Sequence, residues 1–286
     1  MSTLTEAVRM GHAKSIADRF HPRLKISQAS VQDILTKLSY SLKGPLEVSI
    51  YRLWSLESPE ERSLLVPCAD GEISIYTHYG YSQHYALILQ ILGQKELGRI
   101  FTTIVPQRST WALGSFHYQT WTHNGKSWKE LWEEGQEHFK RKDALMAYLK
   151  VDWAKKFLLP NPYFSYEAFE QVQMFQNSML PQTLWEKQVK TLLPQWKVRY
   201  LGTLLAEEDL GLVLRLEAHA ELNSYEMRVE CGKVWTALRS RPELRQLGGL
   251  RCGFLLNRED GTADGSMGSL YIKEGSTEGK GGLPNG

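Results

Sequence analysis

The last third of the chain constrains the fold most, because residues 195–272 change between β-prone and helical patterns in one definite order. Four segments are short, apolar and β-prone, and one carries apolar residues at mostly helical spacing. In chain order they are Trp196–Leu205, Leu210–Ala218, the helical Glu226–Leu238, Leu250–Leu256 and Ser269–Ile272. This order predicts an antiparallel sheet covered by one helix. The residues expected in its core are Leu214, Leu216, Val234, Leu238 and Phe254.

Shorter signals of both kinds come before this unit. Apolar spacing predicts helices at 31–42 and 84–97 and strands at 46–56 and 71–79. Residues 110–128 predict a hairpin, since Asn124-Gly125 is the dipeptide that best fits a type I′ turn. A helical middle at 128–193 is interrupted at Pro160-Asn161-Pro162. The expected fold class is therefore α+β, an antiparallel sheet packed against helices.

We expect one globular domain, residues 31–273, between two ends without fixed structure. Residues 1–30 are basic, and their apolar residues are few and scattered, which predicts a flexible arm. Residues 274–286 are rich in Gly, Ser and Lys and predict a disordered tail.

Composition limits the function classes. The formal net charge of +2 is small for a protein that binds nucleic acid mainly through phosphates. The cysteines Cys68, Cys231 and Cys252 are widely spaced and odd in number, which argues against a disulfide scaffold and fits a reducing compartment. No apolar run approaches the roughly 20 residues that span a bilayer, and no signal-type apolar core is present. We therefore expect a protein of the cytosolic or nuclear side.

Motifs for catalysis and metal binding are missing from the sequence. It has no Gly-rich phosphate loop, no His-Glu-x-x-His and no Cys-x-x-Cys. Four histidines lie in one region, but their spacing fits no common ligand pattern, so we interpret them as structural: His78, His84, His117 and His123. We expect no cofactor, no metal and no catalytic residues.

Two basic clusters remain as candidate binding sites. The first lies in the N-terminal arm and consists of Arg9, Lys14, Arg19, Arg23 and Lys25. It is either a solvated arm or an arm attracted to an anionic membrane surface. The second consists of Lys140, Arg141, Lys142, Lys155 and Lys156. It is either a solvated helix face or a patch for nucleocapsid contact or nuclear import.

In this order of elements the chain resembles the matrix proteins of rhabdoviruses. The likeness lies in the basic N-terminus, in Tyr81–Gly93, which looks like the family's first core helix, and in the closing strands, helix and hairpin from Leu201 to Ile272. A Pro-Pro-x-Tyr motif is missing, and the helical middle is longer than in animal-virus members. Both departures indicate a plant-infecting, nucleus-replicating branch.

The resemblance implies a non-enzymatic matrix protein that self-associates into a homo-oligomer and condenses the ribonucleoprotein through the viral nucleoprotein. It implies attachment to an anionic membrane surface and to the cytoplasmic tail of the glycoprotein during assembly and budding. The implied locations are the virion under the envelope, the host cytoplasm and membrane surface, and the host nucleus, with host import or sorting factors as further partners.

Two other classes of function stay open. One is a cellular α+β enzyme or regulatory domain with an unrecognised site. The other is a sequence-independent nucleic-acid binder that stacks bases on Trp111, Trp121 and Trp128, although the low net charge limits this interpretation.

Overall fold

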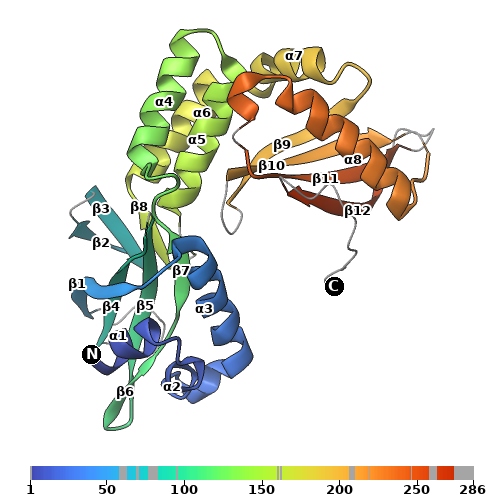
Figure 1. The fold of residues 1–286 in the computed structure, drawn as a ribbon. Helices are drawn as coiled ribbons and strands as arrows, with labels where there is room; N and C mark the ends of the chain where they lie inside the picture. Colours follow the sequence, from blue (N-terminus) through green and yellow to red (C-terminus); the bar gives the residue numbers. More distant parts are fainter. Residues whose placement is uncertain are drawn as a thin grey trace. The chain divides into compact units, whose positions relative to one another are not determined.

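The computed structural model of this chain divides into two compact units (Figure 1). Unit 1 comprises Met1–Glu134 and Ala154–Asn177, and unit 2 comprises Gly135–Trp153 and Ser178–Gly286. The prediction of a single domain is therefore wrong, because the chain crosses between units inside its helices, where no Gly- or Pro-rich linker marks a boundary. The structure describes residues 2–57, 63–68, 71–76, 83–94, 96–159, 161, 163–205, 210–218, 220–245, 247–257 and 263–273.

Unit 1 is built from an N-terminal helical layer and two antiparallel sheets. Its N-terminal helices are α1 (Ser2–Arg9), α2 (Ala13–Ala17), the 3-10 turn η1 (Pro22–Leu24) and α3 (Gln28–Leu42). Its strands are β1 (Glu47–Glu57), β2 (Ser63–Cys68), β3 (Gly71–Tyr76), β4 (Gln83–Leu92), β5 (Leu97–Gln107), β6 (Thr110–Leu113), β7 (His117–Thr120) and β8 (Phe164–Tyr166). The larger sheet has the order β1-β4-β5-β6, with β7 also paired to β5, and the smaller has the order β2-β3-β8.

The N-terminal segment is folded, and the prediction of a flexible arm is wrong for its described residues. Val8 and Ile16 are 1% and 0% exposed, and they belong to one core cluster with Leu35 of α3 and Leu89 and Ile100 of the larger sheet. The apolar residues look scattered along the sequence, but the short helices α1 and α2 bring them onto one inner face. The sequence did not reveal these helices because they are short, and five to eight residues give only a weak periodic signal.

Residues 84–97 do not form the predicted helix, because β4 occupies Gln83–Leu92. Leu87 and Leu89 belong to the core cluster beneath the helices, while Ala86 and Ile88, on the opposite face of the strand, are both 0% exposed. A strand buried on both faces is apolar throughout and lacks alternation, so its sequence cannot be distinguished from that of a buried helix by periodicity.

The predicted hairpin at 110–128 is wrong in its pairing. β6 and β7 each pair with β5 and not with one another. The Asn124-Gly125 turn itself is present, with φ of 49° and 73° at the two residues, but it joins only a bridge between His123 and Lys126. The predicted helix at 31–42 and the strand at 46–56 are confirmed as α3 and β1 with shifted bounds. The predicted strand at 71–79 is confirmed as β3 for its described residues, and 77–79 lie outside them.

The predicted helical middle is confirmed as four helices. They are α4 (Trp128–Lys140), α5 (Ala144–Leu158), α6 (Ala168–Met179) and α7 (Gln182–Leu192). The break expected near Pro160 lies between α5 and α6, where the short strand β8 pairs with β3. No helix among the described residues is long and apolar enough to span a membrane.

The four-stranded sheet of unit 2 has the predicted order of elements along the chain. The elements are β9 (Lys197–Leu205), β10 (Leu210–Ala218), α8 (Ser224–Arg239), the 3-10 turn η2 (Pro242–Leu244), β11 (Gly249–Asn257) and β12 (Ala263–Lys273). The spatial order is β12-β11-β10-β9, and the central pair β10–β11 is parallel, so the sheet is mixed and not purely antiparallel as predicted. The physical reason is that α8 connects the two strands as a crossover, which returns the chain in the same direction.

The predicted core of unit 2 is confirmed. Leu214, Leu216, Val234 and Phe254 are 0% exposed, and Leu238 is 2% exposed. A capping box begins α8, since the side chain of Asn223 accepts from the backbone of Glu226 while the Glu226 carboxylate accepts from Asn223. This arrangement starts the helix where its apolar residues meet the sheet.

A disulfide joins Cys231 of α8 to Cys252 of β11, and both residues are fully buried. The cysteine pattern predicted no such bond, because cysteines 21 residues apart are brought together only by packing of the helix on the sheet. The spacing of the three cysteines therefore gives no support for a reducing compartment.

Reduction of this disulfide should lower the free energy of unfolding of unit 2 by about 3 kcal/mol, since the bond closes a loop of 21 residues in the unfolded chain. Denaturant unfolding with and without a phosphine reductant measures the change, and Cys68→Ala is the control that should leave it unaltered. Titration of the denatured, unreduced chain should find one thiol, that of Cys68. Three reactive thiols would show that the bond does not form.

Candidate functional sites

The N-terminal surface of unit 1 carries the first predicted cluster. We define this surface by its exposed basic residues together with three exposed apolar residues nearby. The basic residues are Arg9, Lys14, Arg19, Arg23 and Lys25, and the apolar residues are Leu24, Ile26 and Trp111.

Backbone hydrogen bonds fix part of this surface against the sheet. The amide of Leu113 in β6 donates to the carbonyl of Arg19, and the amide of His21 donates back to the carbonyl of Leu113, at 2.7 and 2.9 Å. Phe20 packs edge-on against Phe116 inside the layer. Trp111 lies two residues before Leu113 on β6 and so projects from the same face of the strand. The segment that follows His21 therefore begins beside β6.

The basic side chains of this surface differ in their pairing. Arg9 makes an ion pair with Glu6 at 2.6 Å, and its hydrogen bonds lower the pKa of that carboxyl, so this pair adds no net charge. The Nε of Arg19 donates to the carbonyl of Ser15. Lys14, Arg23 and Lys25 make no ion pair with a carboxylate of the described residues. Against Asp18, the four basic residues other than Arg9 leave a net charge of +3 on the folded surface.

The second predicted cluster is divided by the structure. Lys140, Arg141 and Lys142 lie in unit 2 at the turn between α4 and α5, whereas Lys155 and Lys156 lie in unit 1. Lys155 and Lys156 are half-buried, and the Nζ of Lys155 donates to Gln176 at 2.5 Å. The five residues predicted as one patch thus belong to two different units, and the patch stays a prediction.

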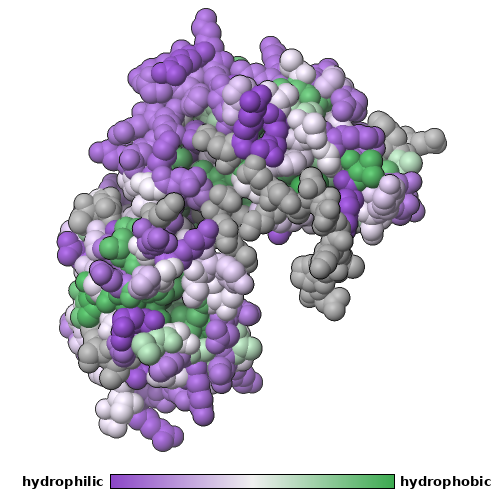
Figure 2. Space-filling view, in the orientation of Figure 1, coloured by the Kyte–Doolittle hydropathy of each residue, from purple (hydrophilic) through white to green (hydrophobic). Residues whose placement is uncertain are grey.

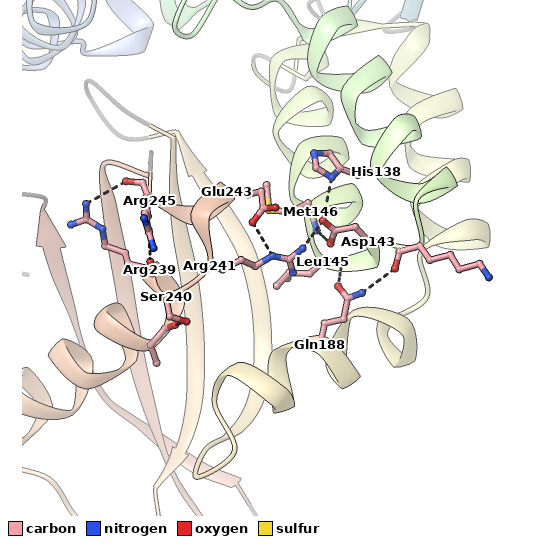
Figure 3. Close-up of polar contacts among 12 residues, drawn as sticks. His138, Asp143, Leu145, Met146, Gln188, Arg239, Ser240, Arg241, Glu243 and Arg245 are labelled. Carbon is pink, nitrogen blue, oxygen red and sulfur yellow. Dashed lines mark hydrogen bonds and ion pairs between the residues drawn. The ribbon is translucent and has the colours of Figure 1, made fainter.

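The turn between α4 and α5 is held by a polar network (Figure 3). The Asp143 carboxylate accepts from Arg241 at 2.5 Å and from His138 at 3.2 Å, and it caps α5 by accepting from the amide of Met146. From α7, Gln188 donates to the carbonyl of Lys142 and accepts from the amide of Leu145. This network fixes the backbone of the basic turn, while Arg141 and Lys142 stay exposed.

Two buried charged groups could suggest catalysis, but their contacts are structural. Arg99 is 2% exposed, its guanidinium lies 4.0 Å from the ring centroids of both Tyr51 and Trp121, and it donates to the hydroxyl of Tyr166. It therefore joins β5 to β1 and to β8. In unit 2, Asp152 accepts from the amide and hydroxyl of Thr203, which ties α5 to β9.

The histidines do not form a metal site in the described part of the chain, where no group of three or more His, Cys, Asp or Glu could hold an ion. His84 and His123 are buried at 0% and 8% exposure, and burial lowers the pKa of His117. His78 lies outside the described residues.

One candidate surface was missed by the sequence interpretation. The face of the β9–β12 sheet opposite its apolar core exposes Tyr200, Arg215, Arg251 and Tyr271. The signal that could have found it is the period of two in each strand, where aromatic or basic residues alternate with core residues or glycine.

No solved structure, no protein-family model and no curated protein matches this chain.

Proposed function

We propose that this chain is a non-enzymatic protein that attaches to an anionic membrane surface through the N-terminal surface of unit 1. The observation that carries the proposal is the alternation of exposed basic and apolar residues in the segment after His21: Arg23, Leu24, Lys25 and Ile26. Leu24 and Ile26 are 42% and 40% exposed, and Trp111 is 46% exposed. Apolar side chains beside cations are typical of proteins that lie in a membrane interface.

The expected strength of attachment is modest. A net charge of +3 near an anionic leaflet contributes roughly 3 kcal/mol, since each basic residue there contributes about 1 kcal/mol. The attraction is screened over about 8 Å at physiological ionic strength. Stable coating of a membrane therefore requires several copies acting together.

We assign the expected self-association to β1, the end strand of the larger sheet in unit 1. Figure 2 shows hydrophobic residues at the surface of unit 1 where Figure 1 labels β1 and β4. Ile50 and Leu53 of β1 and Leu92 of β4 are 45%, 41% and 49% exposed. An end strand with exposed apolar side chains is a typical place for chains to associate.

A viral matrix role, with ribonucleoprotein and a glycoprotein tail as partners, is the more specific form of this proposal. It rests on the resemblance in sequence pattern. Of the three segments behind that resemblance, Gln83–Leu92 is a strand and not the family's first core helix, and the basic N-terminus is folded against the sheet. The closing strands and helix keep their predicted order along the chain, although β10 and β11 are parallel. The attachment proposal stands on the exposed residues of unit 1 and does not depend on the viral role.

Replacing Lys14, Arg19, Arg23 and Lys25 with Gln should weaken binding to anionic liposomes by roughly 1,000-fold, because four cations are removed and each contributes about 1 kcal/mol of electrostatic attraction. Co-sedimentation of the full chain with anionic and neutral vesicles measures the effect. The matched control replaces four basic residues of unit 2 with Gln: Lys140, Arg141, Lys142 and Lys187. Equal losses in the two variants, or none in the first, would contradict the proposed site.

A further inference from the structure

The sheet of unit 2 has two different faces. Leu212, Leu214 and Leu216 of β10 are buried with the apolar residues of α8, and the residues between them project from the opposite face. Val213 and Arg215 lie on that opposite face, with Tyr200 on β9 beside Arg215 in the register. Arg251 on β11 pairs with Val213 on one side and with Tyr271 on β12 on the other.

The register places these side chains in two neighbouring rows across the sheet. The first row is Tyr200–Arg215–Gly253–Ser269, and the second is Gly202–Val213–Arg251–Tyr271. Each row thus has one tyrosine on an outer strand and one arginine on the central strand next to it. Since neighbouring strands are about 4.8 Å apart, the outer strands that carry the tyrosines lie roughly 14 Å apart.

Both tyrosine rings lean over a glycine. A Cβ atom added at Gly202 would lie 2.8 Å from Cζ of Tyr200, and one added at Gly249 would lie 2.8 Å from Cε2 of Tyr271. Because glycine has no Cβ, each tyrosine ring can pack against the backbone of the sheet instead of projecting away from it. Tyr200 and Tyr271 are nevertheless 46% and 41% exposed, so each presents ring surface to solvent.

The charge on this face is positive. Arg215 and Arg251 are exposed, and neither makes an ion pair with a carboxylate of the described residues. The guanidinium of Arg215 lies 5.6 Å from the ring centroid of Tyr200. Glu217, on the same strand, is held by Lys197 and Arg199, so its charge is compensated at one end of the face. Although burial raises the pKa of the Glu217 carboxyl, the bonds from these two residues hold it below the ordinary value.

We propose that this face of the β9–β12 sheet binds single-stranded nucleic acid, with bases stacked on Tyr200 and Tyr271 and phosphates contacted by Arg215 and Arg251. Exposed aromatic rings on a sheet are suited to two or three unstacked bases, and stacking tolerates any sequence. Two local arginines are enough for such a site, so the small net charge of the whole chain does not argue against it.

The positions predicted for stacking from sequence are not available as one platform. Trp121 is 4% exposed and packs against Phe101 and Tyr166. Base stacking is therefore assigned to the tyrosines of unit 2 and not to the tryptophans of unit 1. The tyrosines could have a purely structural role, which is to cover glycines in the sheet. That role explains the orientation of their side chains but not the two exposed arginines beside them.

The test uses the full chain and fluorescence anisotropy of labelled single-stranded RNA, single-stranded DNA and a duplex of equal length. We expect binding of the single strands and weaker binding of the duplex. Tyr200→Leu with Tyr271→Leu keeps an apolar cover over the glycines but removes the rings, and should weaken binding by about 25-fold or more, since each stacked base contributes at least about 5-fold. Tyr200→Phe with Tyr271→Phe should retain it.

The proposed phosphate contacts of the arginines are tested by measuring how the affinity depends on salt concentration. Arg215→Gln with Arg251→Gln should reduce the slope of log affinity against log salt by about 1.4, the value for two phosphate contacts on a single strand. The matched controls lie on α8, where Tyr225→Ala and Arg228→Gln change exposed residues of the same types and should have no effect. Thermal melts confirm that every variant is folded.

Four outcomes would overturn the proposal: no binding at low salt, equal or tighter binding of the duplex, an unchanged affinity in the Tyr→Leu variant, or an equal loss in the α8 controls. Loss of anionic-vesicle binding in the Tyr→Leu variant, with no nucleic-acid binding by the parent, would instead assign the face to lipid. The inference is independent of membrane attachment by unit 1, because the four-residue Gln variant of that unit should bind nucleic acid as the parent does.

Discussion

Replacing Ile16 with Ala should lower the free energy of unfolding of unit 1 by about 2–5 kcal/mol. Ile16 is 0% exposed, and it belongs to the core cluster that α1, α2 and α3 form with the larger sheet. The smaller side chain leaves a cavity between the helical layer and the sheet, and it also loses the transfer free energy of the deleted methylene and methyl groups. Denaturant unfolding of the full chain, followed by hydrogen exchange of α1–α3 and β6, locates the loss in unit 1.

The matched control for this prediction is Ile26→Ala. Ile26 is the same residue type in the same N-terminal segment, but it is 40% exposed, so its replacement should change stability by no more than about 0.5 kcal/mol. Equal effects of the two substitutions would mean that residues 2–24 are not packed on the sheet. The prediction also matters for membrane experiments, because removing this segment would expose the core of unit 1 and not simply remove an arm.

Replacing Leu216 with Ala should cost unit 2 about 2–5 kcal/mol. Leu216 is 0% exposed on β10, where it pairs with Val198 on one side and with Phe254 on the other. It lies on the face that packs against α8, so its truncation removes contacts from the centre of the sheet–helix core. The loss should appear in denaturant unfolding and in faster exchange of the β10 and β11 amides.

Leu184→Ala is the control for Leu216. Leu184 lies on α7 in the same unit and is 42% exposed, so its replacement should have little effect. If Leu216→Ala were as harmless as the control, β10 would not be a central strand. The disulfide between Cys231 and Cys252 must be intact in both variants, since it contributes to the same core.

Structural features that depend only on residues close together in the sequence were predicted correctly. The order of strands and helix in unit 2 follows from local apolar spacing, and so does the burial of Leu214, Leu216 and Phe254. The positive φ of Asn124 and Gly125 follows from the chemistry of the two residues, whatever surrounds them. The existence of the α4–α7 helices has the same origin.

The sites depended more on tertiary structure than the fold did. The five basic residues predicted as one patch are divided between the units, and Arg9 of the N-terminal cluster is paired with Glu6. The Tyr200 and Tyr271 face could not be proposed from sequence, because it requires the register of four strands. Arg215 and Arg251 become neighbours of these tyrosines only through that register.

By itself the sequence determined which segments are helical or extended wherever one face is buried and the other is polar, because the period of the pattern then reports the element. Only the tertiary structure decided that β4 is a strand, that β10 and β11 run parallel, and that α1 and α2 cover a sheet. The physical reason is that a strand buried on both faces has no alternation of apolar and polar residues to report it. Strand direction and the packing of short helices are set by contacts between residues far apart in the chain.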